Sequence, residues 1–147
     1  MRSQLFTTEK YSFVEKNVIE LINSTQDIVN ARSLGSPRAV GDAIQELLET
    51  KFPELLPADI LKNYSSAFAR RSMADFAFED VDSFYYVVDN KTHNLGTDFN
   101  MPNLTSVERL SRFYEDDNNY FTLLTVAYAV VDDSIEARSC HFIPIEH

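Results

Sequence analysis

Residues 73–93 constrain the fold more than any other part of the sequence. Two short runs rich in aromatic and β-branched residues flank the acidic, turn-forming segment 79–83, which predicts a β-hairpin. Successive side chains of a strand point to opposite faces. On the second strand, one face is expected to carry Tyr85, Val87, Asp89 and Lys91, and the other Phe84, Tyr86, Val88 and Asn90. A strand that is apolar on both faces and ends in an aspartate and a lysine mounts a charged site on a rigid element.

The composition is that of one ordered domain. A chain of 147 residues with 44% hydrophobic residues and only 3 Gly is long and apolar enough for a single core. The only cysteine is Cys140, which excludes an internal disulfide and a cysteine metal cluster and favours a reducing, cytoplasmic compartment. No apolar run has the length of a membrane span, and the N-terminus lacks the charged-then-apolar order of a signal peptide.

Apolar spacing and turn-forming residues divide the rest of the chain. Helices are expected over residues 7–30, over 58–69, and from Thr105 or Ser106 to Tyr114. A further helix is expected to begin at the Ser36-Pro37 cap and to end at Pro53, because proline breaks helices. Strands are expected over 120–131 and 135–145. The first of these is nearly continuously apolar, as is typical of a central strand covered on both sides. These elements predict a single α/β domain over residues 1–147, with a mixed sheet of about four strands flanked by helices.

Three charged residues of the hairpin form a pattern that is similar to the motif of a known family. Asp75 lies near the start of the first strand, and Asp89 and Lys91 end the second. This arrangement resembles the PD-(D/E)xK nuclease superfamily, whose best-known members are the type II restriction endonucleases. Two further segments are similar to restriction-enzyme sequence, Thr92-His93-Asn94 and residues 99–106. The resemblance extends from about residue 35 to near the C-terminus, and it implies a restriction-endonuclease-like sheet.

The chain departs from the family pattern at two positions of the hairpin. Ala74 stands where the family often has proline, a residue that only shapes the backbone. Asn90 stands where the family usually has an apolar residue. A buried amide without partners costs about 1–3 kcal/mol, so Asn90 must find hydrogen bonds or the strand end must be wet.

The resemblance implies a metal-dependent endonuclease that hydrolyses phosphodiester bonds of double-stranded DNA at a specific sequence. In that family Asp75 and Asp89 would hold Mg²⁺, and Lys91 would position the attacking water. The family often adds a metal-binding glutamate from the helix before the hairpin. Glu46 is the candidate here, with Glu49 beside the same apolar stripe as the other choice. A solvated glutamate on the helix surface is the alternative for either residue.

Other polar residues near the hairpin are candidates for DNA contacts. Arg70 and Arg71 precede the first strand and form a basic cluster suited to phosphates. The segment 92–103 has loop composition, and its side chains suit base edges or phosphates. The candidates within it are His93, Asn94, Asn100 and Asn103. The alternatives are solvated arginines and an ordinary surface loop.

The net charge of −10 opposes DNA binding, which depends largely on lysine and arginine contacts to phosphates. Carboxylates of a nuclease site are neutralised by bound metal, and other acids gather in turns away from the hairpin. The rival interpretation is a catalytically inactive nuclease-like domain that binds DNA or protein, including an acidic DNA mimic. A homodimer is expected, because two copies on a two-fold axis most simply cut both strands of a symmetric site. A fragment that lacks a C-terminal part is a further possibility.

Overall fold

We describe the protein from a computed structural model that covers residues 2–25, 27–30, 32–65, 74–98 and 107–145. The chain runs through α1 (Gln4–Thr7), α2 (Lys10–Ser24), α3 (Pro37–Leu55), β1 (Leu61–Ser65), β2 (Phe76–Asp80), β3 (Tyr85–Asn94), α5 (Val107–Phe113), β4 (Asn119–Val131) and β5 (Ser134–Pro144). The part of the chain described here has no helix with the length and apolar character that crossing a membrane requires.

The strands form one mixed, open sheet in the order β1-β2-β3-β4-β5. β3 and β4 pair in parallel, and the other neighbours are antiparallel. The α/β class and the mixed, helix-flanked sheet are confirmed, but the sheet has five strands rather than the predicted four. The additional strand is β1, in the segment 58–69 where we predicted a helix. Its pairing with β2 outweighs the local helical pattern, since sheet formation depends on neighbouring strands more than on propensity.

The predicted hairpin is confirmed, as is its division of side chains between two faces. β2 and β3 pair in antiparallel register around a turn in which Asp80 accepts hydrogen bonds from two backbone N–H groups. The main core lies on the face of Phe84, Tyr86 and Val88, beneath α2 and α3. A smaller cluster around Val87 lies on the opposite face, beneath α5.

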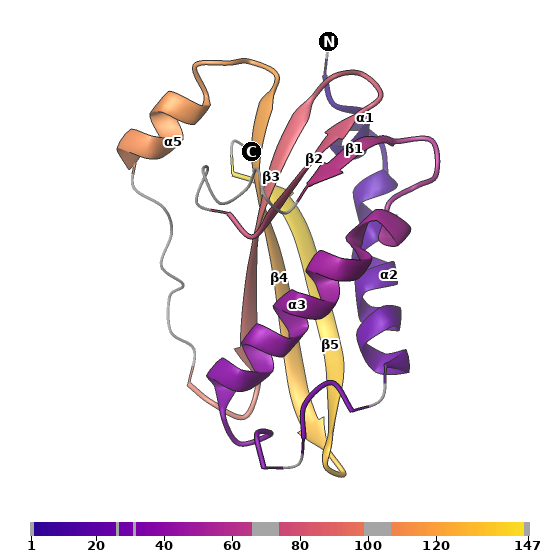
Figure 1. The fold of residues 1–147 in the computed structure, drawn as a ribbon, viewed down its shortest axis with the longest axis vertical. Coiled ribbons are helices and arrows are strands. Elements are labelled where there is room, and N and C mark those ends of the chain that lie inside the picture. The colour runs from indigo at the N-terminus through magenta and orange to yellow at the C-terminus, as the bar shows by residue number, and fades with distance from the viewer. Residues whose placement is uncertain (1, 26, 31, 66–73, 99–106, 146–147) are drawn as a thin grey trace.

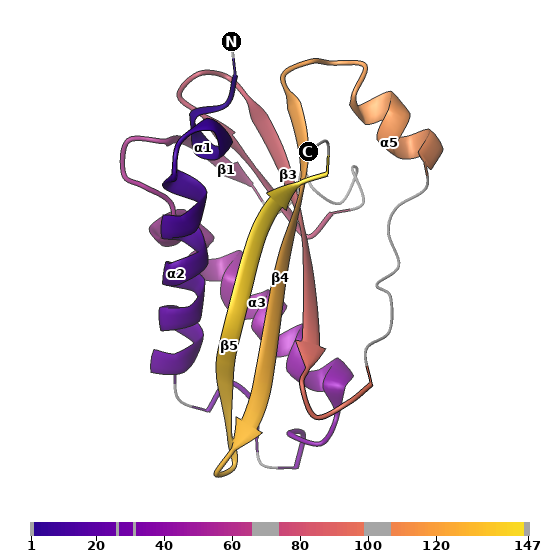
Figure 2. The same ribbon diagram turned by 180° about the vertical axis from the view of Figure 1, so that it is seen from behind.

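The two faces of the sheet are covered unequally. Figure 1 shows α3 crossing in front of the sheet with α2 beside it, whereas α5 stands apart at one end. Figure 2 shows the opposite face, where β3, β4 and β5 run for much of their length without a helix in front of them. β4 lies inside the sheet between β3 and β5, but the predicted cover on both sides is not found along its length among the described residues. One row of its side chains stays partly exposed.

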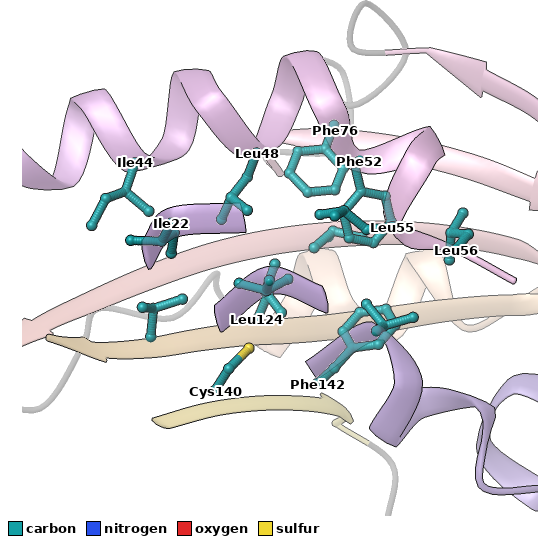
Figure 3. Packing of buried hydrophobic residues seen from close by; sticks show 14 of the residues in the cluster. Ile22, Ile44, Leu48, Phe52, Leu55, Leu56, Phe76, Leu124, Cys140 and Phe142 are labelled. Atoms are coloured by element: carbon teal, nitrogen blue, oxygen red, sulfur yellow. The ribbon is translucent and has the colours of Figure 1, made fainter. Parts of the chain in front are cut away.

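α3 begins as the sequence predicts. Ser36 caps the helix by accepting a hydrogen bond from the Ala39 N–H, and Pro37 occupies the first turn. Its buried residues contact the sheet, as Figure 3 shows for Ile44, Leu48 and Phe52. The helix does not end at Pro53, as predicted, but continues to Leu55.

Two other boundaries differ from the predictions. In place of the helix predicted over 7–30, the structure has the short α1 and the longer α2, which ends at Ser24. The exposed Thr8 separates the two helices because its backbone is in the extended conformation. β3 runs to Asn94, so the first part of the predicted loop 92–103 is strand, held by its parallel pairing with β4. Asp132 and Asp133 form the predicted turn between β4 and β5, both in the left-handed conformation that aspartate tolerates.

Candidate functional site

Asp75 is held against β3 by two backbone hydrogen bonds. Its own N–H donates to the Val88 carbonyl at 2.9 Å, which extends the hairpin pairing by one residue beyond β2. Its Oδ2 accepts the Asn90 N–H at 2.6 Å. The donor of this second bond, the Asn90 N–H, lies on the part of β3 that extends past the end of β2. The Asp75 carboxyl group is thus oriented by the backbone of the strand that carries the other candidate residues.

Asp89 and Lys91 follow on β3, on the same face as Asp75. The Lys91 Nζ lies 3.2 Å from the Asp89 Oδ2. The Asp89 side chain is 11% exposed and the Lys91 side chain 31% exposed, so the lysine ammonium reaches solvent while the carboxylate is nearly covered. The hairpin therefore brings together all three residues that the sequence singled out.

The two carboxyl groups affect each other's ionisation. Burial raises the pKa of Asp89, and the neighbouring Lys91 offsets part of that rise. Burial also raises the pKa of Asp75, opposed by the Asn90 N–H and reinforced by the negative charge of Asp89. The pair is thus an acidic site that favours a bound cation or a retained proton.

The surroundings of this site are apolar at one end and polar at the other. Ala77, Val87 and Phe121 lie toward α5 and pack against its inner side. In the parallel register, Asp89 lies beside Leu123 of β4, and Lys91 beside Thr125. This part of the face is the region that Figure 2 shows without a covering helix.

The α3 glutamates lie in different surroundings. Glu46, the residue preferred from the sequence, is exposed and lines a shallow pocket with Thr25 and Ile28, away from the aspartate pair. Glu49 is half-buried, and its charge contributes to the raised pKa of Asp75. Of the two glutamates, Glu49 is the one whose charge affects the pKa of Asp75. The sequence placed both beside the apolar stripe of the helix, and only the packing of α3 on the sheet distinguishes them.

The predicted DNA-contacting residues divide into two groups. His93 and Asn94 end β3, and His93 shares a face with Lys91. The Asn94 Oδ1 accepts the Gly96 N–H at 2.9 Å. Arg70, Arg71, Asn100 and Asn103 lie outside the described residues.

Asn90 shows how this strand end departs from an ordinary core. The residue is 8% exposed, on the face that packs beneath α3. Within the described part of the chain, its Oδ1 is buried without a hydrogen-bond partner. Its backbone N–H nonetheless orients Asp75, a contact that any residue other than proline would make at this position. The Asn90 side chain therefore contributes no described contact to the site.

The site suits a hard divalent cation. Mg²⁺ is usually bound through one or two carboxylates, with waters and substrate phosphates as its other ligands. In the described ranges, no group of three or more His, Cys, Asp or Glu side chains is arranged to hold a metal ion. Asp75 and Asp89 are the two carboxylates that this site could offer to such an ion.

Comparison with known proteins adds no assignment: neither a family model nor a curated protein matches this chain.

Proposed function

We propose that this protein is a Mg²⁺-dependent endonuclease that cuts double-stranded DNA at a specific sequence, in the manner of a type II restriction enzyme of the PD-(D/E)xK superfamily. One observation carries the proposal. Asp75, Asp89 and Lys91 lie on one face of a hairpin, with Asp75 opposite Asp89 and the Lys91 Nζ 3.2 Å from the Asp89 Oδ2.

The cation would be held by Asp75 and Asp89. When bound, Mg²⁺ lowers the pKa of a coordinated water and neutralises charge that develops on the phosphate. The covered position of Asp89 keeps its carboxylate poorly hydrated, which strengthens its attraction for a cation. The hydrogen bond from Asn90 keeps Asp75 facing Asp89.

Lys91 supplies a positive charge beside the same carboxylate. Its ammonium group is partly exposed, so it can move from Asp89 to a phosphate oxygen or a water without leaving the site. In this proposal it orients the attacking water and stabilises negative charge on the phosphate. The proposed chemistry needs a metal ligand and a cationic group beside the same phosphate. Alternation of side chains along β3 places Asp89 and Lys91 on one face, where they can fill these two roles.

Glu49 replaces Glu46 as the third carboxylate of the proposal. The charge of Glu49 reaches Asp75, whereas Glu46 is exposed beside Thr25. A glutamate that does not ligand the ion directly can orient a metal-bound water. Glu49→Gln should therefore reduce cleavage more than Glu46→Gln, and the opposite order would restore the choice made from the sequence.

DNA would approach the open face of β3, β4 and β5. His93 and Asn94 adjoin the site on β3, and the proposal includes Arg70, Arg71, Asn100 and Asn103 as further contacts. Cutting both strands of a symmetric sequence requires two sites, which supports a homodimer. The proposed dimer interface is the long N-terminal helix α2, which presents Phe13 at 49% exposure.

The net charge of −10 favours a second candidate, a nuclease-like domain that binds without cutting. A direct test incubates the purified protein with phage DNA and Mg²⁺ or Mn²⁺ and looks for discrete bands. Asp89→Ala and Lys91→Ala should each abolish cleavage, because each removes a separate part of one site. Asp132→Asn is the matched control, since it removes one acid from an exposed turn far along the chain. Wild-type activity in either site variant would refute the site, and a wild type that binds but never cuts DNA would favour the second candidate.

A further inference from the structure

The backbone carbonyl of Glu49 has an exceptional hydrogen-bond partner. In an α-helix this carbonyl accepts the N–H of the residue four positions later. That residue is Pro53, which lies inside α3 and has no N–H. The hydroxyl group of Tyr64, on β1, donates to the Glu49 carbonyl instead. A side chain of the edge strand thus completes the hydrogen bonding of the helix interior and allows α3 to continue through the proline.

The same turn of α3 is packed against the strand that begins next to Asp75. The rings of Phe52 and Phe76 have centroids 4.6 Å apart, and both side chains are fully buried. The Tyr64 ring lies 6.0 Å from the Phe76 ring. Figure 3 shows Phe52 and Phe76 side by side between α3 and β2. Because Phe76 directly follows Asp75, these rings connect the backbone of Glu49 to the backbone of Asp75.

We propose that Tyr64 is a positioning residue for the metal site: by binding the carbonyl that Pro53 leaves free, it sets where Glu49 stands relative to Asp75. The inference rests on the proposed function, in which Glu49 is the third carboxylate. Without the hydroxyl, the Glu49 carbonyl would turn outward to find water, and the helix would bend at the proline. The Glu49 side chain leaves the same residue and would move with it. Burial and the charge of Glu49 raise the pKa of Tyr64, so its hydroxyl stays a donor at neutral pH.

A thermodynamic cycle tests the hydrogen bond without reference to activity. Tyr64→Phe keeps the ring and removes the hydroxyl, and should lower the melting temperature by roughly 3–6 °C because the Glu49 carbonyl loses its partner. Pro53→Ala restores the helical N–H. In that background, Tyr64→Phe should cost less than half as much, because the backbone N–H of the introduced alanine can donate to the same carbonyl. Equal costs in the two backgrounds would overturn the assignment.

Metal dependence tests the positioning role. At a temperature where every variant is folded, Tyr64→Phe should raise the Mg²⁺ concentration for half-maximal cleavage about tenfold, as expected when support of a metal ligand is lost. The thermal shift produced by Ca²⁺ should fall in parallel. Pro53→Ala combined with Tyr64→Phe should recover most of both. Tyr11→Phe is the matched control, because Tyr11 lies on α2 and stacks on Phe6.

The outcomes separate this inference from the function on which it rests. Reduced stability with an unchanged Mg²⁺ requirement in Tyr64→Phe would make Tyr64 purely structural and overturn the positioning role. A wild type with no cleavage and no Ca²⁺ shift would overturn the proposed function and the positioning role with it, even if the Tyr64–Pro53 coupling were measured. A raised Mg²⁺ requirement that Pro53→Ala reverses supports the inference.

Discussion

Asp89→Asn is expected to stabilise the metal-free protein at neutral pH. Asp89 is 8% exposed and faces Asp75, and burial raises the pKa of both carboxyl groups, so keeping the pair charged is unfavourable. The amide has the same shape and can donate to Asp75. The variant also loses the ion pair with Lys91, but that lysine side chain is 31% exposed, and such pairs contribute only about 0–1 kcal/mol. Removing the buried charge should therefore outweigh losing the ion pair.

The same variant should lose most of the stabilisation that metal gives to the wild type. A cation that binds only the folded protein adds about 2.7 kcal/mol at a hundred times its Kd. For a chain of 147 residues, an unfolding entropy of about 2.1 cal/mol/K per residue converts this to a shift of about 9 °C. A thirtyfold weaker Kd in Asp89→Asn would leave a shift of about 3 °C at the same concentration.

The assay is a melting series for wild type and Asp89→Asn, without metal and with rising Ca²⁺. Ca²⁺ occupies oxygen sites and supports cleavage poorly in the family, so it reports binding alone. Asp132→Asn removes an equal charge from the turn between β4 and β5, where φ is 50° and asparagine is well tolerated. It should keep the full shift. An undiminished Ca²⁺ shift in Asp89→Asn would refute the metal site and point to diffuse binding by surface acids.

Three further outcomes are expected. The protein should sediment as a homodimer at micromolar concentration, and a monomer both free and on DNA would contradict this. Without metal, the raised pKa values of Asp75 and Asp89 mean that the folded state binds protons more tightly than the unfolded state. The two protonated groups therefore stabilise the fold most below the unfolded pKa of about 4, and this stabilisation is lost as the pH rises through their folded-state pKa values. Urea unfolding from pH 4.5 to 8 should show this dependence reduced in Asp89→Asn, and an identical slope would contradict it. Asp80→Ala should cost about 3–5 kcal/mol, because it leaves two turn N–H groups and the Tyr86 hydroxyl without their buried acceptor, whereas Asp82→Ala should cost far less in the same unfolding measurement.

Alternation along the hairpin made the grouping of Asp75, Asp89 and Lys91 on one face predictable from the sequence. Period two places Asp89 and Lys91 on one face whatever the rest of the fold does, and antiparallel pairing then brings Asp75 opposite. The helix glutamate was not predictable in this way. Glu46 and Glu49 flank the same apolar stripe, and the rotation of α3 on the sheet decides which of them acts on Asp75.

Two errors in the fold, the helix end at Pro53 and the helix over 58–69, share a physical cause, because contacts distant in sequence overrode local signals. Pro53 predicts a helix end, but the Tyr64 hydroxyl replaces the hydrogen bond that proline removes. Tyr64 itself lies in a segment with a helical pattern that becomes a strand by pairing with β2. The two errors are therefore linked. β1 pairs with β2, and Tyr64 on β1 supplies the hydrogen bond that Pro53 cannot donate to α3.

The acidity of the chain also has a partly structural origin. Asp80 and Asp116 accept backbone N–H groups in turns, at 2.9 Å in each case. Asp27, Asp132 and Asp133 hold positive φ angles that few other residues adopt. These aspartates make turns, a role that asparagine could fill without charge, and they are dispersed among separate turns. A DNA mimic needs its acids in a continuous array that imitates phosphates. Among the described acids, these turn-forming aspartates differ from the covered pair Asp75 and Asp89 beside Lys91, which is the pair that the proposed nuclease activity would use.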